Sequence, residues 1–212
     1  MRKLGFVAAA TFALLGSTAF AKTTVIYAGR VITDAARPAQ GLSTVTVTDG
    51  RITAIAPGRG AAPDGAEVVD LGDKTLLPGL IDLHVHLTGD PGGDFRSEAV
   101  DPDEWGVVVG AKNARITLRA GFTTVREAGS AQYTAFSLRR GTAEGYIEGP
   151  RIIAAGPPLA IIGGHGDTTG FREDVHAVLD QGYTCTGAVE CAEKVRKASR
   201  AGADVIKITA TG

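Results

Sequence analysis

The sequence contains little cysteine and almost no net charge. Only two of its 212 residues are cysteines, Cys185 and Cys191, and 22 basic side chains nearly balance 23 acidic ones, for a net charge of −1. A chain without a basic excess lacks the electrostatic footprint of a nucleic-acid binder or of a protein that binds an anionic membrane surface. The C-x5-C spacing, with no histidine nearby, does not fit a zinc site. A disulfide and two free thiols are equally compatible with it.

Several signatures of catalysis are also absent. The sequence has no Walker loop, no G-x-G-x-x-G turn, no nucleophile elbow and no Cys/His pairing for thiol catalysis. These absences argue against a nucleotide-dependent enzyme, a serine hydrolase of the α/β type and a thiol enzyme. The hydrophobic content of 44% nevertheless supports a globular core.

Long hydrophobic runs are missing except at the N-terminus. An apolar run from Leu4 to Leu15 follows the basic start Met1-Arg2-Lys3 and precedes the small-x-small site Ala19-Phe20-Ala21. This order predicts a signal peptide over residues 1–21 that is cleaved after Ala21. We therefore expect residues 22–212 to be exported, periplasmic or secreted, with no membrane anchor left after cleavage.

The first part of the mature sequence reads as β-structure. Alternating residues predict strands over residues 24–28, 30–33, 44–48, 51–56 and 67–71. Asp49-Gly50, between two of these strands, is a strong hairpin signal. The pattern predicts a small all-β domain over residues 22–76, and nothing in this region suggests chemistry.

From residue 77 to residue 212, apolar strands alternate with helices. We expect strands that start near residues 80, 122 and 151, a strand over 204–209, and helices over 101–120, 131–140 and 188–201. This alternation indicates a parallel sheet with right-handed crossovers, and both a doubly wound sheet and a (β/α)8 barrel fit it. A closed barrel needs eight β/α units and only four are present, so a barrel implies an incomplete chain.

The strand that follows Pro78-Gly79 carries two histidines one residue apart. Side chains alternate along a strand, so Asp82, His84 and His86 share one face and the apolar residues between them share the other. Two imidazoles with Cβ atoms about 6–7 Å apart can reach one metal ion. An ordinary pair of strand histidines is the alternative. We predict half of a metal site, with Asp82 as a candidate partner that orients the histidines.

Lys207 is the second unusual residue, because it lies between isoleucines in the predicted strand over 204–209. An unpaired ammonium in a buried strand is costly. A structural ion pair would remove this cost, and a Schiff-base lysine is a functional alternative. A neutral amine could also react with carbon dioxide and form an anionic carbamate that bridges two divalent metal ions.

Glycines flank His165 in Gly163-Gly164-His165-Gly166, so the backbone there can approach a ligand closely. An imidazole in this loop could contact substrate or transfer protons, and a solvent-facing histidine is the alternative. We expect His176 on the surface. Arg126 and Glu127 end a predicted strand, where charged residues are ordinary, and they are not among our candidates.

These motifs together resemble the amidohydrolase superfamily. Residues 78–86 resemble its first-strand signature. Four further stretches resemble its branch of imidazolonepropionase-like and Xaa-Pro (prolidase-type) dipeptidases, at residues 121–126, 149–151, 163–166 and 202–207. The resemblance runs from about Val25 to Gly212. It implies a (β/α)8 TIM-type barrel, of which the first four β/α units are present, preceded by a β domain that forms part of a composite β-sandwich.

The resemblance also implies a site and a reaction. His84 and His86 would ligate the more buried of two divalent metal ions, expected to be zinc, although manganese, iron and nickel are not excluded. Carboxylated Lys207 would bridge both ions, and His165 would lie near the substrate. A metal-bound hydroxide would hydrolyse the amide or peptide C–N bond of a dipeptide-like or N-acyl amino-acid substrate. The general base and two further histidines are expected beyond Gly212, so we expect this chain alone to be inactive.

Three alternatives stay open. The chain could be a non-catalytic remnant that packs or binds a single metal, a cyclic amidase or imidazolonepropionase-type ring hydrolase, or a metal-free barrel that uses Lys207 as a Schiff base. The sequence departs from the family in having Glu127 where aspartate is expected and Ile162 where threonine often stands. The expected partner is a small amide or dipeptide, and both a monomer and a homo-oligomer are compatible with the sequence.

Overall fold

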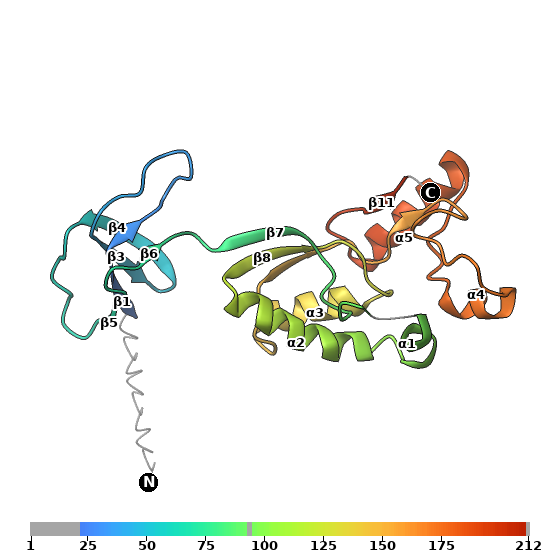
Figure 1. Cartoon of the computed structure of the whole chain (residues 1–212), viewed down its shortest axis with the longest axis horizontal. Helices are drawn as coiled ribbons and strands as arrows, with labels where there is room; N and C mark the ends of the chain where they lie inside the picture. Colours follow the sequence, from blue (N-terminus) through green and yellow to red (C-terminus); the bar gives the residue numbers. More distant parts are fainter. Residues whose placement is uncertain (1–21, 93–94, 211–212) are drawn as a thin grey trace, which may run out of the picture. The chain divides into compact units, whose positions relative to one another are not determined.

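The chain divides into two compact units, one that ends at Pro78 and one that begins at Gly79 (Figure 1). The structure, a computed structural model, describes residues 22–92 and 95–210. The predicted signal peptide, residues 1–21, lies outside the described residues. Each unit is considered by itself below.

The first unit contains a four-stranded sheet in the order β4-β3-β1-β5. Its strands are β1 (Thr23–Ala28), β3 (Ser43–Thr48), β4 (Arg51–Pro57) and β5 (Glu67–Asp70). β3 pairs with β1 and β4 in antiparallel fashion, and β5 lies parallel to β1. The predicted strands and the hairpin are confirmed: Asp49 and Gly50 have φ angles of 49° and 75°, the positive values that a tight two-residue turn requires.

Two shorter strands complete this unit, β2 (Arg30–Val31) and β6 (Thr75–Leu76), which pair in parallel. The sequence did not predict β6. Ala28, Val31 and Val45 form the centre of the core and are at most 3% exposed. The core thus lies where β1 continues into β2 and packs against β3.

The second unit is built on a parallel sheet of three strands, β7 (Leu80–Val85), β8 (Phe122–Glu127) and β9 (Arg151–Ala154). Two helices, α2 (Trp105–Arg119) and α3 (Thr134–Ala143), run along one face of this sheet (Figure 1). The core between them consists of Leu87, Ala114, Val125, Ala135, Phe136, Leu138, Ile152 and Ala154. The predicted strand–helix alternation is therefore confirmed in this region.

The first predicted helix is shorter than expected. A separate helix, α1 (Phe95–Val100), precedes it, and α2 begins at Trp105 rather than at residue 101. Asp101 and Pro102 lie in the turn between the two helices, where the Trp105 N–H donates to the Pro102 carbonyl at 2.9 Å. Proline at that position therefore ends one helical segment before the next begins.

The predicted strand over residues 204–209 is wrong in its extent. Only β11 (Ile208–Thr209) is a strand, and it pairs in parallel with the equally short β10 (Leu159–Ala160). Within the described ranges, the parallel strands of this unit thus form a three-stranded and a two-stranded sheet. Lys207 lies just before β11 and is half-buried, rather than in the middle of a buried strand.

The residues between β9 and β10 explain why the three-stranded sheet does not continue into the pair of β10 and β11. Pro157 and Pro158 have no N–H to donate, and Gly156 has a φ of 71°, so this stretch cannot continue a regular ladder. The two segments still run beside each other, because the Asp204 N–H donates to the Ala154 carbonyl and the Leu159 N–H donates to the Lys207 carbonyl, both at 2.9 Å.

The last helices are α4 (Glu173–Leu179) and α5 (Gly187–Ala201). Gly202 follows α5 directly, and its φ of 109° is the left-handed conformation that closes a helix, as the sequence predicts. Cys185 and Cys191 are joined in a disulfide with a Cα–Cα distance of 5.1 Å, which decides between the two states that the sequence left open. Among the helices described, none is both long and apolar enough to cross a bilayer.

Candidate active site

The four predicted site residues come together at one cavity. His84 lies on β7, His86 follows its end, His165 lies in the loop after β10 and Lys207 precedes β11. All four line a cavity of about 150 Å³, which is completed by Ala128, Pro158, Gly166 and Thr209. Segments that are far apart in the sequence thus meet where β7 and β8 end.

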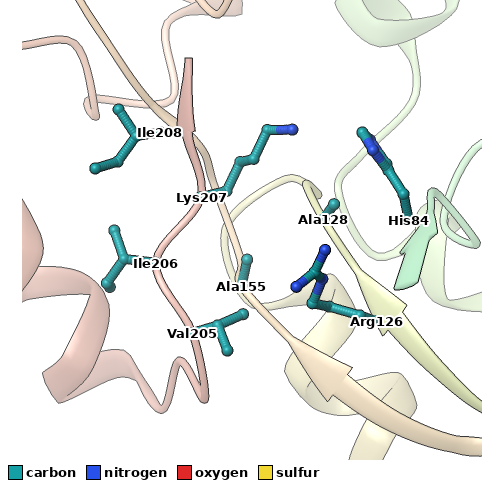
Figure 2. A pocket seen from close by; sticks show the side chains of 8 residues that line it. All are labelled: His84, Arg126, Ala128, Ala155, Val205, Ile206, Lys207 and Ile208. Atoms are coloured by element: carbon teal, nitrogen blue, oxygen red, sulfur yellow. The ribbon is translucent and has the colours of Figure 1, made fainter. Parts of the chain in front are cut away.

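A second cavity of about 270 Å³ adjoins the first and shares His84, Ala128 and Lys207 with it. Figure 2 shows that the side chains of His84, Lys207 and Arg126 surround this space. Nε of Arg126 donates to the Leu83 carbonyl at 2.6 Å, which anchors the guanidinium against β7. Arg126, which the sequence analysis set aside, is therefore part of the cavity wall.

The two strand histidines lie close together, with ring centroids 5.3 Å apart and ring planes inclined at 64°. Nδ1 of His86 lies 2.9 Å from the Gly129 carbonyl oxygen. A carbonyl can only accept, so Nδ1 carries a proton, and in the neutral imidazole Nε2 then keeps its lone pair. Histidines that bind metals in proteins are held in this way, and the geometry of His86 therefore fits a metal ligand.

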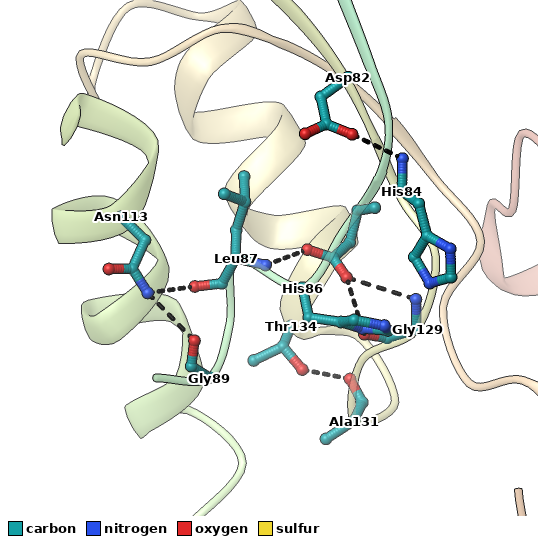
Figure 3. Close-up of polar contacts among 10 residues, drawn as sticks. Asp82, His84, His86, Leu87, Gly89, Asn113, Gly129, Ala131 and Thr134 are labelled. Carbon is teal, nitrogen blue, oxygen red and sulfur yellow. Dashed lines mark hydrogen bonds and ion pairs between the residues drawn. The ribbon is translucent and has the colours of Figure 1, made fainter. Parts of the chain in front are cut away.

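Asp82 has a different role from the predicted one. Its carboxylate accepts the backbone N–H of His84 at 2.9 Å, as Figure 3 shows. Asp82 therefore holds the main chain of β7 and contacts His84 through the backbone rather than through the imidazole.

Glu127 is the residue that the sequence analysis missed. Its side chain is 0% exposed, its Oε2 accepts the Leu87 N–H at 2.5 Å, and its Oε1 accepts the Gly129 N–H at 3.3 Å. Oε1 also lies 3.5 Å from Nδ1 of His86. The Glu127 carboxylate raises the pKa of His86, and the Gly129 carbonyl adds to this effect, while burial opposes it.

A signal for Glu127 was present in the sequence. Alternation along β8 puts Glu127 on the same face as Val125, which is fully buried. A buried carboxylate needs hydrogen-bond donors, and those donors belong to the segments that carry His86 and Gly129. The departure from the family pattern at residue 127 therefore falls on a residue that organises the site.

Asn113 of α2 holds the same loop from the other side. Its Nδ2 donates to the carbonyls of Leu87 and Gly89 at 2.9 Å and 3.1 Å (Figure 3). Leu87 is thus fixed at both backbone groups, by Glu127 at its N–H and by Asn113 at its carbonyl. Because Leu87 follows His86 directly, these contacts also fix the position of His86.

His165 is exposed. The expectation that His176 is a surface residue is only partly correct. The His176 side chain is 32% exposed, and its Nε2 lies 3.2 Å from Oδ1 of Asp167, two residues after His165. The imidazole of His176 thus links α4 to the loop that carries His165.

The chemistry of the donors partly fits a metal centre. Within residues 22–92 and 95–210, no three His, Cys, Asp or Glu side chains are grouped as a metal site. The cavity offers two imidazoles and Lys207, whose ammonium is a donor and cannot ligate a cation. The two histidines fit a metal as they stand, and Lys207 fits only after a modification that makes it anionic.

The chain is similar to solved structures of dipeptidases. A Xaa-Pro dipeptidase with methionine bound in its active site matches with a TM-score of 0.79 and 33% identity, over 88% of this chain and 47% of that one. A prolidase in complex with N-methylphosphonate-L-proline matches with a TM-score of 0.73 and 26% identity, over 88% and 46%. The chain thus spans about half the length of these proteins, and over the matched part its fold is that of TIM-barrel amidohydrolases.

Curated relatives match over shorter stretches. The allantoinase of Streptomyces avermitilis is 49% identical over 69 residues, which are 32% of this chain and 14% of the relative. A dihydroorotase of Anaeromyxobacter sp. (strain K) is 35% identical over 100 residues, 47% of this chain and 20% of the relative. The model of the amidohydrolase family matches residues 75–212, more than half of the chain. The chain belongs to the amidohydrolase family, and the resemblance found in the sequence is confirmed.

Proposed function

We propose that the protein is a metal-dependent amidohydrolase that hydrolyses the C–N bond of dipeptide-like or N-acyl amino-acid substrates. The observation that carries the proposal is the convergence of His84, His86, His165 and Lys207 on one cavity. Family membership supports a hydrolase that acts on small amides, and members of the family generally use divalent metals. The chain covers 47% of the matched dipeptidase, so the proposal concerns the full-length protein.

In this proposal His84 and His86 would hold a divalent ion, and carboxylated Lys207 would share it with a second ion, both expected to be zinc. Such ions would lower the pKa of bound water and polarise the substrate carbonyl. The hydrogen bond from Nδ1 to the Gly129 carbonyl supports the part of His86 in this set, because it leaves Nε2 of the neutral imidazole available as the ligand atom.

The other residues of the chain would position these groups. Glu127 and Asn113 fix the turn after His86 through the backbone of Leu87. His165 reaches the cavity from a loop on the opposite side and is proposed to contact the substrate, as a donor or as an acceptor. The Leu159 N–H donates a hydrogen bond to the Lys207 carbonyl. This bond fixes the backbone of Lys207 and so positions the Lys207 side chain.

Two observations bear on substrate and location. The similarity to a Xaa-Pro dipeptidase and a prolidase favours a dipeptide with proline at its C-terminus, whereas the similarity to an allantoinase and a dihydroorotase favours a cyclic amide as the second candidate. Export to the periplasm or the medium is proposed from the sequence of residues 1–21. The Cys185–Cys191 disulfide supports it, because such bridges persist in oxidising compartments.

The test is a substrate panel with the purified full-length protein and metal analysis of the same samples. We expect bound divalent metal, turnover of Xaa-Pro dipeptides or N-acyl amino acids, and loss of both in His84→Ala. Hydrolysis of cyclic amides alone would favour the second candidate. A matched control is Arg119→Gln, which removes an exposed ion pair with Glu148 on the far end of α2 and should change neither readout.

The proposal also makes a statement about residues 22–212 expressed alone. We expect no turnover from them with added zinc, because the matched dipeptidases are about twice as long as this chain. Clear turnover that disappears in His84→Ala would contradict this expectation. Turnover that survives metal removal and His84→Ala in the full-length protein would overturn the proposed function itself.

A further inference from the structure

Asp167 organises the loop that carries His165. Its Oδ2 accepts the N–H of Gly163 at 2.7 Å, and its Oδ1 accepts the N–H of Thr168 at 2.8 Å. Its own N–H donates to the Gly164 carbonyl at 2.9 Å. One side chain therefore closes the loop on both sides of His165.

His176 connects this closed loop to α4. Its Nε2 lies 3.2 Å from Oδ1 of Asp167, whose side chain is 7% exposed. The carboxylate is thus shielded from water, and each of its oxygens already has a partner within the protein. The Gly163 N–H holds the pKa of Asp167 below its usual value, and the His176 imidazole contributes to the same effect.

The other contacts of the loop are made by its backbone, and the Gly164 N–H donates to the Ile161 carbonyl at 2.9 Å. Gly163 has a φ of 78°, a conformation that favours glycine, and His165 stands between Gly164 and Gly166, which have no side chains to pack. A Cβ on Gly166 would lie 2.6 Å from Oγ1 of Thr209 and 2.8 Å from Cβ of Ala160, so the backbone itself packs against β10 and β11. The position of His165 therefore depends on the hydrogen bonds of Asp167 together with this backbone packing.

We propose that Asp167 and His176 are positioning residues that hold His165 at the cavity it shares with His84, His86 and Lys207. Asp167 acts through the loop backbone and His176 acts through Asp167. The activity assay of this role rests on the proposed function. The hydrogen bonds from which the role is inferred do not depend on that function.

The choice of substitution follows from the contacts. An amide in place of the carboxylate has one acceptor oxygen, so Asp167→Asn loses either the Gly163 contact or the contacts to Thr168 and His176. His176→Ala removes the link to α4, and His176→Gln keeps a side-chain N–H that can donate to Asp167. Asp174→Asn is the matched control, because Asp174 is an exposed residue of the same helix that pairs with Arg172.

The first measurement is kcat and KM of the full-length enzyme with its preferred substrate from the panel. We expect kcat/KM to fall about tenfold in Asp167→Asn, because a small displacement of a group that contacts substrate is costly. His176→Ala should show a smaller loss that His176→Gln restores, and Asp174→Asn should match the wild type. A wild-type kcat/KM in Asp167→Asn would overturn the proposal, and a His176→Gln variant as impaired as His176→Ala would overturn the role of His176.

A double-mutant cycle separates positioning from general stability. If Asp167 acts through His165, then Asp167→Asn should cost nothing further in a His165→Ala background. Equal losses in both backgrounds would mean that Asp167 stabilises the fold without positioning His165, and would overturn the proposal.

The second measurement does not need turnover. Hydrogen–deuterium exchange of the amides of residues 163–168 should be about tenfold faster in Asp167→Asn than in the wild type or Asp174→Asn, since one of the two N–H donors, that of Gly163 or that of Thr168, loses its acceptor. A wild-type protein without amide hydrolysis would end the proposed function and leave this measurement intact. Unchanged protection of residues 163–168 would overturn the positioning role.

Discussion

His86, which follows β7, and the pair formed by His165 and Lys207 are held in different ways. His86 is fixed by a fully buried carboxylate of the neighbouring strand and by an amide of the helix that covers it. His165 and Lys207 lie on segments close to the point where Pro157 and Pro158 interrupt the sheet, and hydrogen bonds of the loops hold these segments. One half of the cavity is therefore built on a regular sheet, and the other half depends on particular side chains.

The largest expected effect comes from Glu127→Gln. The amide keeps the size but loses one acceptor, so a buried N–H of Leu87 or Gly129 loses its partner, at a cost of about 3 kcal/mol in the free energy of unfolding. Metal affinity should fall about 10- to 100-fold, because His86 is less well oriented. Chemical denaturation and metal titration measure the two effects.

The matched control for this variant is Glu148→Gln, the same substitution at an exposed ion pair. It should change the free energy of unfolding by less than about 0.5 kcal/mol. Equal effects of the two substitutions would show that burial of Glu127 is not what holds the β7–β8 end of the cavity.

Removal of the Cys185–Cys191 disulfide tests the other half. The double substitution to serine should lower the free energy of unfolding by about 2 kcal/mol, as expected for so short a closed loop. The Cys185 N–H donates to the Ala160 carbonyl of β10 at 2.9 Å, so local protection should be lost around β10 and not around His86. Denaturation with and without reductant measures the first effect, and reductant should leave the double variant unchanged.

Gly166→Ala should displace the His165 loop by direct contact. The new methyl group meets Thr209 and Ala160 at less than 3 Å, and overpacking of this kind costs about 1–2 kcal/mol. Gly89→Ala is the control in the loop after β7, where a Cβ meets nothing within 4 Å. Thermal unfolding compares the two. A Gly89→Ala variant that loses more stability than Gly166→Ala would contradict the expectation that the His165 loop is packed more tightly than the loop after β7.

The smallest effect is expected for Asn113→Ala. The carbonyls of Leu87 and Gly89 would lose their shared donor, at a cost of about 1 kcal/mol, with faster exchange in residues 87–90. The neighbouring Lys112→Met removes only an exposed ion pair with Asp90 and should cost less. If both variants behave alike, the loop after His86 is held by surface charge rather than by Asn113.

Much of the fold could be predicted because local patterns dominate it. The hairpin at Asp49-Gly50 and the end of α5 at Gly202 follow from backbone conformations that few residues adopt. The strands β7, β8 and β9 follow from apolar runs between turn residues. The extent of β11 could not be predicted in this way, because the prolines that limit it lie about 50 residues earlier, in its partner segment.

The sequence by itself determined the residue types of the site: two histidines on one strand face, a lysine in an apolar stretch and a histidine among glycines. Tertiary structure alone decided that they meet at one cavity, that Cys185 and Cys191 are bridged, and that Glu127, Asn113 and Asp167 hold the segments around the site. The physical reason is the range of the interactions. Alternation and backbone preference act between neighbours in sequence, whereas a buried carboxylate finds its donors only where folding brings distant backbone groups together.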